Sequence, residues 1–92
     1  MNIGRIAHAL VVALAVWQLR GTIVGVDHDH LRVRHKSGQV VELLLDDHTV
    51  FLRGKVRVTI DALQSARRIA GDVQPLGDGR QRAVTVRLFG RR

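Results

Sequence analysis

The sequence predicts an all-β fold: a small barrel of five strands with one short helix between the third and fourth strands. Two observations predict it. Apolar and polar residues alternate with a period of two in several separate runs, as in strands that bury one face. Short clusters of Gly, Asp, Ser and Pro separate these runs and supply the turns. With 92 residues, 46% of them hydrophobic, the chain is long enough for one domain with one small core.

The first two strands are expected to form a hairpin. The alternation predicts a strand over Gln18–Asp27, in which two glycines permit the bending that a small barrel needs. Residues 27–29, Asp-His-Asp, supply the turn, and the second strand spans Leu31–Lys36. In that strand Leu31 and Val33 face one way and the two arginines between and after them face the other.

The third strand is expected over Val40–Asp46, with a short extension over His48–Leu52 after an acidic interruption. Extended chain continues through Val56 and Val58 and leads to the predicted helix, IDALQSA, at residues 60–66. Thr59 is a suitable N-cap for this helix, and Asp61 lies in its first turn, where a negative charge complements the helix dipole.

Two further strands complete the predicted barrel. Arg67–Gln74 and Arg80–Phe89 are separated by the turn cluster Pro-Leu-Gly-Asp-Gly. In the last strand Val84, Val86 and Leu88 are predicted to face inward. Because the chain holds few aromatic residues, the core is expected to be aliphatic. The predicted domain covers residues 16–90.

The N-terminal residues 1–15 have the layout of a secretory signal peptide. Arg5 precedes the apolar run Ile6–Val16, and Ala13-Leu14-Ala15 has the small-x-small form of a cleavage site. The run is shorter than the ~20 residues of a membrane-spanning helix. An uncleaved anchor and a helix packed on the barrel are the alternatives. Cleavage would leave a mature protein that begins near Val16 and is periplasmic or secreted; a cytoplasmic location is the alternative.

The charge of +7 is carried almost entirely by arginine, and it suggests an anionic partner. Period-two spacing places two outward groups of cations on consecutive extended segments. If the two groups adjoin, they form a basic groove suited to single-stranded nucleic acid, although aromatic residues for stacking are scarce. The candidate basic surface consists of Arg32, Arg34, Arg53, Lys55 and Arg57.

His28 and His30 are the candidate metal ligands. Residues i and i+2 of a straight strand project to one face, so these imidazoles could bind Zn²⁺ or Cu²⁺, with Asp27 and Asp29 as additional or supporting groups. A polar turn with incidental histidines is the alternative. The absence of cysteine excludes disulfides, thiolate catalysis and Cys-ligated zinc. The sequence holds no nucleophile motif and no phosphate-binding loop, so we expect no enzyme.

The chain resembles a family of small exported bacterial OB-like β-barrel domains of unknown function. The resemblance is carried by residues 21–34 (GTIVGVDHDHLRVR), 38–55 (GQVVELLLDDHTVFLRGK), 59–63 (TIDAL) and 83–88 (AVTVRL). It departs at the helix exit, where Ser65-Ala66 stands in place of a glycine. The periplasmic copper/silver chaperones are more distantly similar. Their site uses methionine thioethers, and this chain has no methionine after Met1, so no ligand is carried over.

The sequence therefore predicts an exported, non-catalytic binding or accessory module of the bacterial envelope, with an OB-like barrel. Its partner would be an envelope protein or a metal ion. A periplasmic metal-binding protein that uses His28 and His30 is the first alternative. A basic OB-type module that binds nucleic acid is the second alternative, and it requires that residues 1–15 are not a signal. Because export would place the protein away from nucleic acid, nucleic acid is not the expected partner.

Overall fold

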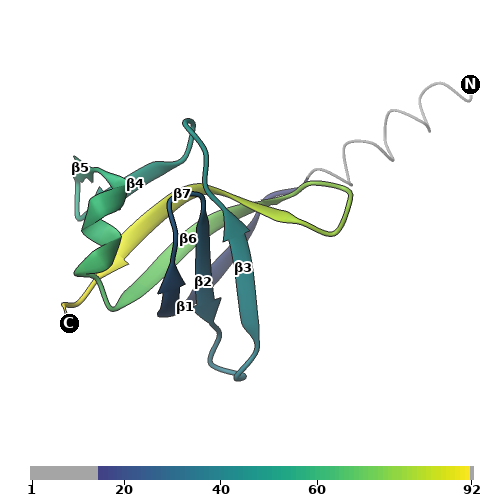
Figure 1. Cartoon of the computed structure of the whole chain (residues 1–92), viewed down its shortest axis with the longest axis horizontal. Helices are drawn as coiled ribbons and strands as arrows, with labels where there is room; N and C mark the ends of the chain where they lie inside the picture. The colour runs from purple at the N-terminus through teal and green to yellow at the C-terminus, as the bar shows by residue number, and fades with distance from the viewer. Residues whose placement is uncertain (1–14, 92) are drawn as a thin grey trace, which may run out of the picture.

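Residues 15–91, which the computed structural model describes, form one twisted seven-stranded sheet and a single short 3-10 helix (Figure 1). The 3-10 helix, η1, lies between the fifth and sixth strands. The elements are β1 (Trp17–Val26), β2 (His30–Arg34), β3 (Val40–Leu44), β4 (Val50–Arg53), β5 (Val56–Val58), η1 (Ile60–Gln64), β6 (Arg68–Pro75) and β7 (Gln81–Phe89).

The sheet curls into a partly closed ring. The strand order is β3-β2-β1-β6-β7-β4-β5, and β3 also pairs in parallel with β7 through Leu44 and Arg82. This one pair closes a ring of β3, β2, β1, β6 and β7. The β4–β5 hairpin pairs with the same edge of β7 as β3, further along that strand, and lies beside η1, at the end of the molecule where the chain finishes (Figure 1).

The prediction of an all-β fold is confirmed, but the predicted number of five strands is wrong. The expected third strand and its extension separate into β3 and β4 because the chain turns between them. Asp46 Oδ1 accepts the backbone N–H of His48 at 2.9 Å, and the Asp46 N–H donates to Thr49 Oγ1 at 3.1 Å. Gly54, with a φ of 64°, then reverses the chain and pairs β4 with β5.

The predicted helix between the third and fourth strands is also corrected. The chain has no helix there, and the segment instead forms η1 after β5. Thr59 occupies the N-cap position but its side chain makes no capping hydrogen bond, while Asp61 does lie in the first turn. Leu63 is the buried residue of η1. Packing of this leucine, rather than capping, therefore holds the segment on the sheet.

The core fills the inside of the ring and is aliphatic, as predicted, except for buried Phe51. Leu31 and Val33 are fully buried, whereas Arg32 and Arg34 are exposed, so the predicted faces of β2 are confirmed. A bulge opposite Asp72 and Val73 shifts the register of β7, so Ala83 is fully buried while Val84 is only half-buried. The largest fully buried side chains are Leu19, Leu31, Leu43, Leu63, Ile69, Leu88, Val33, Val73 and Val86.

The prediction of a signal peptide at residues 1–15 falls almost entirely on residues 1–14, which lie outside the described residues. Within residues 15–91, no helix is both long and apolar enough to cross a membrane.

Candidate functional site

The outer face of the sheet carries cations from three segments that are distant in the sequence. Arg34 of β2 and Arg68 of β6 are both in register with Thr22 of β1, so the two arginines flank this small residue on one face. Arg20 lies two residues before Thr22 on β1 and projects from the same face. Lys36 follows β2, and all four cations are exposed.

These four cations surround one hollow, which we call the basic hollow. It has a volume of about 640 Å³, and its lining contains no acidic residue. The backbone at Gly21 lies in its wall. A Cβ atom at this position would come within 2.3 Å of the carbonyl oxygen of Arg34. The absence of a side chain at Gly21 therefore lets β2 approach β1 closely and brings Arg34 to the hollow.

None of the four cations has an anionic partner within the described part of the chain. Other arginines do form ion pairs, with N–O distances of 4.0 Å for Arg32–Glu42, 2.7 Å for Arg80–Asp78, 3.1 Å for Arg82–Asp46 and 3.3 Å for Arg87–Asp72. Asp72 lies on the same outer face, but its carboxylate is bound to Arg87. The positive potential of the basic hollow is therefore uncompensated by its surroundings, which favours an anionic ligand.

An exposed aromatic ring lies next to the basic hollow. Phe89 of β7 is in register with Arg68, and 49% of its surface is exposed. A smaller hollow of about 290 Å³ lies between this ring and the cations and is contiguous with the basic hollow, because both share Arg20, Gly21 and Arg68. Its remaining walls are Ile69, Ala70 and Phe89. Positive charge and a flat apolar ring thus lie side by side on this face.

The structure separates the basic residues predicted from the sequence. Only Arg34 lies in the basic hollow, and Arg32 pairs with Glu42. The other three, Arg53, Lys55 and Arg57, belong to the β4–β5 hairpin. In the strand order this hairpin is separated from β2 by β1, β6 and β7, and across the closing pair by β3 and β7. The two predicted groups therefore do not adjoin.

Sequence reasoning misses Arg20 and Arg68, although both are central to the basic hollow. Arg20 is a single arginine and Arg68 follows Arg67, and neither stands out from the arginine-rich composition. Pairing of β1 with β6 is what places them together. A signal that could have found them is the run of outward-facing positions on those two strands, which alternate with buried Leu19 and Ile69.

His28 and His30 both contact the carboxylate of Asp29 but line different hollows. His30 Nδ1 donates to Asp29 Oδ1 at 2.6 Å, and His28 Nε2 lies 3.6 Å from Oδ2. The hydrogen bond from His30 holds the pKa of Asp29 below its usual value. His28 lies in the turn beside Asp46 and Asp47, whereas His30 begins β2 and lines a separate groove.

The geometry around these histidines does not gather a ligand set. Within residues 15–91, no three His, Asp or Glu side chains come close enough to hold one metal ion. The two histidines do not share a strand face, because β2 begins only at His30. A Zn²⁺ or Cu²⁺ site at these residues stays a prediction.

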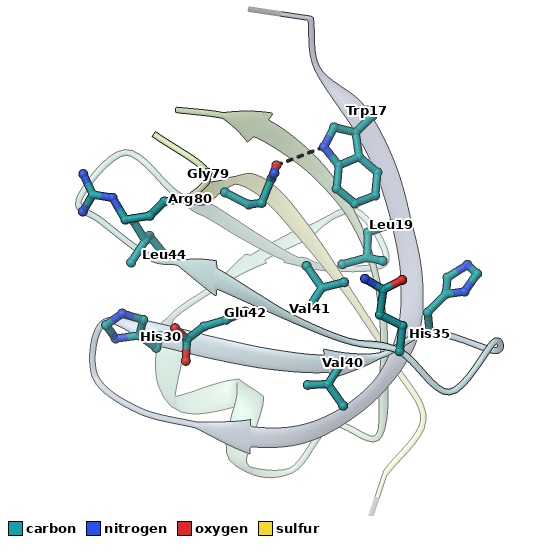
Figure 2. A pocket seen from close by; sticks show the side chains of 12 residues that line it. Trp17, Leu19, His30, His35, Val40, Val41, Glu42, Leu44, Gly79 and Arg80 are labelled. Atoms are coloured by element: carbon teal, nitrogen blue, oxygen red, sulfur yellow. Dashed lines mark hydrogen bonds between the residues drawn. The ribbon is translucent and has the colours of Figure 1, made fainter. Parts of the chain in front are cut away.

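A mixed groove lies where the ring is least closed (Figure 2). β3 meets β7 only at Leu44, and a groove of about 620 Å³ separates the rest of its edge from the start of β7. The indole of Trp17 lies at this groove, and its Nε1 donates to Gln81 Oε1 at 3.1 Å. Because both Glu42 and Arg80 line it, the groove lacks the single sign of charge that distinguishes the basic hollow.

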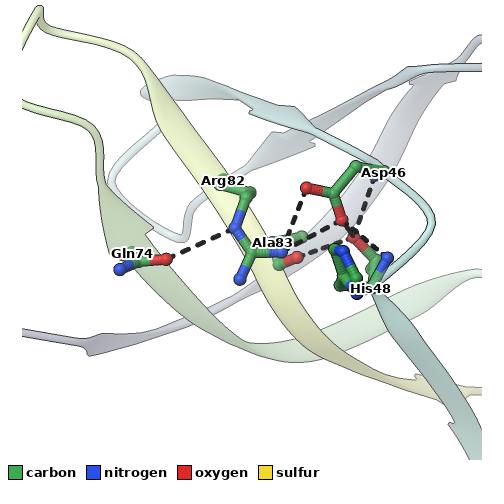
Figure 3. A network of polar contacts seen from close by, with 6 residues as sticks. Asp46, His48, Gln74, Arg82 and Ala83 are labelled. Atoms are coloured by element: carbon green, nitrogen blue, oxygen red, sulfur yellow. Dashed lines mark hydrogen bonds and ion pairs between the residues drawn. The ribbon is translucent and has the colours of Figure 1, made fainter.

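A polar network holds the closing point of the ring together (Figure 3). The guanidinium of Arg82 contacts Asp46 at 3.1 and 3.3 Å and Gln74 at 3.3 Å. Thr49 is buried, and its hydroxyl donates to the carbonyl oxygen of Ala83 at 2.8 Å. Desolvation raises the pKa of Asp46, but hydrogen bonds from the backbone of His48 and from Thr49, together with Arg82, lower it below the usual value. This network ties β7 to the β3–β4 turn.

Comparison of the chain with protein-family models, curated proteins and solved structures gives no significant match.

Proposed function

We propose that the protein is a non-catalytic binding module and that the basic hollow binds a phosphate-bearing polyanion. The observation that carries the proposal is the collection of Arg20, Arg34, Lys36 and Arg68 around one hollow whose lining contains no acidic residue. A solvated surface usually mixes both signs of charge, as the paired arginines on the rest of this sheet do.

The chemistry of the cations favours phosphate. Three of the four are arginines, whose planar guanidinium offers paired N–H donors that match two oxygens of one phosphate. Binding releases the counterions condensed on the polyanion, so affinity is strong at low salt and decreases as salt rises. The hollow is open and lies on the face of a sheet, which suits an extended chain better than a small enclosed substrate.

We also propose that the ring is an OB-like barrel whose third strand is split. β3 and β4 would be the two halves of that strand, since both run parallel to β7. On this interpretation the chain has the predicted barrel order, with η1 as the connecting helix before β6. An experimental structure in which β4 leaves β7 would contradict it.

Export to the periplasm or beyond is part of the proposal and rests on residues 1–15. The intact mass of the protein from its native host tests it. A mature chain beginning at or near Val16 supports export, and retention of Met1 in a soluble form contradicts it. The basic hollow is formed by residues outside 1–15, so the binding proposal does not depend on export.

The binding proposal is tested by titrating a short oligo(dT) and inorganic polyphosphate over a range of salt concentrations. If each of the four cations contacts one phosphate, the slope of log K against log salt for oligo(dT) is about −3. The affinity then falls about fifty-fold between about 50 and 200 mM salt. Arg20→Ala combined with Arg68→Ala halves the slope and reduces the fall to about sevenfold.

The matched control is Lys55→Ala combined with Arg57→Ala. It removes the same charge from the β4–β5 hairpin, at the other end of the sheet. We expect this control to keep the wild-type slope. Equal losses in the two double variants would mean that net charge, not the basic hollow, governs binding. Failure of the wild-type protein to bind either polyanion at low salt would refute the proposed function.

A further inference from the structure

We propose that Phe89 and the smaller hollow beside it form a subsite for a nucleobase, so that the polyanion is a single-stranded nucleic acid. This inference rests on the proposed function and names its ligand class. Phosphate binding alone does not require an aromatic residue beside the cations. A large aromatic side chain is 49% exposed on the same outer face as the unpaired cations.

The two hollows are joined by the residues that they share. Arg20 and Arg68 line both hollows, so two covalently linked groups of one ligand can occupy the two hollows together. The smaller hollow, of about 290 Å³, has room for a single planar ring system. Its walls are apolar at Ala70 and Phe89 and cationic at the two arginines, while Ile69 borders it from the core with 2% of its surface exposed. A ligand that matches both hollows has a negative group next to a flat apolar group, as a nucleotide unit has.

The position of Phe89 supports this assignment. Its partner in the β6–β7 register is Arg68, so the ring and the guanidinium project from neighbouring strands on one face. A base can stack on the ring while its phosphate is bound by the arginines. Phe89 lies outside the core, which its neighbour Leu88 fills with 2% exposure. Packing in the core therefore does not explain why position 89 is aromatic.

A duplex would not fit this subsite, because its bases are stacked within the helix and only their edges are accessible. Inorganic polyphosphate and anionic lipid headgroups can pair with the cations, but they offer no planar group to stack on the phenyl ring of Phe89. The base subsite therefore separates single-stranded nucleic acid from the other polyanions.

The test compares oligo(dT) with an abasic single strand of the same length and with inorganic polyphosphate. One stacked base strengthens binding by a factor of about 5 to 150. We expect the wild-type protein to bind oligo(dT) more tightly than the abasic strand by this factor. Phe89→Leu should remove the difference and leave the affinities for the abasic strand and polyphosphate unchanged. Trp17→Leu is the matched control, because it removes the other exposed aromatic residue, which lies at a different groove.

A second measurement detects the stacking directly. Trp17 is the only tryptophan of the chain. The variant Trp17→Phe/Phe89→Trp therefore reports from position 89 alone. Its fluorescence should be quenched by oligo(dT) and unaffected by polyphosphate.

The outcomes distinguish the two proposals. Equal binding of oligo(dT) and the abasic strand by the wild-type protein, without quenching at position 89, would overturn the base subsite and leave polyanion binding intact. Equal effects of Phe89→Leu and Trp17→Leu would also overturn it. Absence of binding to every polyanion at low salt would overturn both proposals.

Discussion

Replacement of Thr49 by valine tests whether the polar network at the closing point stabilises the ring. Thr49 lies in the turn between β3 and β4 and is 6% exposed. Its hydroxyl donates to the carbonyl oxygen of Ala83 in β7 at 2.8 Å and accepts the N–H of Asp46 at 3.1 Å. Valine has nearly the same shape, so the substitution removes these hydrogen bonds without opening a cavity.

The expected loss follows from the burial of the groups left behind. A hydrogen bond contributes about 1 kcal/mol net, and leaving a buried partner unsatisfied costs about 1–3 kcal/mol. The carbonyl of Ala83 would lose this hydrogen bond in a fully buried position. We expect Thr49→Val to lower the free energy of unfolding by about 2 kcal/mol. For a domain of this size, that loss lowers Tm by about 10 °C.

Urea unfolding followed by circular dichroism measures the change, and Thr59→Val is the matched control. Thr59 is exposed and its side chain makes no capping hydrogen bond, so the same substitution there should change the free energy by less than about 0.5 kcal/mol. Thr49→Ser, which keeps the hydroxyl, should cost less than Thr49→Val. If Thr49→Val and Thr59→Val have equal effects, the hydroxyl of Thr49 does not hold the turn to β7.

Three further predictions concern backbone packing, pH and metal. Gly21→Ala should lower the midpoint of thermal unfolding strongly, because its Cβ would lie 2.3 Å from a backbone oxygen of β2. Gly25→Ala is the control: its Cβ would meet a flexible arginine side chain, so the midpoint should fall much less. The folded-state pKa of Asp46 lies below its usual value, so its stabilising contribution is complete above the usual pKa of an aspartate and is lost as pH falls through the folded pKa. Asp46→Asn should therefore lower the unfolding midpoint near neutral pH, and the difference from wild type should shrink in strong acid. If His28 and His30 bind a metal, calorimetry should show micromolar or tighter binding of Zn²⁺ or Cu²⁺. The double variant His28→Ala/His30→Ala should weaken this binding strongly. Absence of heat with both ions would refute the metal hypothesis.

Local patterns predict the strands well because each strand buries one face. Leu31 and Val33 alternate with exposed arginines, and this pattern alone identifies the face that packs inward. The division of the third strand was harder to predict. The side chain of Asp46 stabilises a turn by accepting the N–H of His48. In the sequence, this turn looks the same as a short polar interruption of one continuous strand.

The candidate site could not be predicted, because it depends on the pairing of strands distant in the sequence. Arg34 and Arg68 flank the same residue only because β1 lies between β2 and β6. The spacing that groups Arg53 with Arg57 is correct within one hairpin, yet it carries no information on which strands adjoin. Charge patterns in a β protein therefore identify outward faces, and the sheet topology decides which of them meet.

Stability and binding should be separable in this protein, because different residues carry them. Arg34 and Arg68 stand on either side of β1, about 10 Å apart at ordinary strand spacing. Two like charges at that distance repel by about 0.4 kcal/mol in water. We therefore expect the unpaired cations to cost the folded state some free energy instead of stabilising it. Arg20→Ala/Arg68→Ala should therefore keep or raise the unfolding midpoint while it weakens polyanion binding, and Thr49→Val should lower the midpoint while the folded fraction binds normally. On the proposed function, the binding of a polyanion would offset this repulsion.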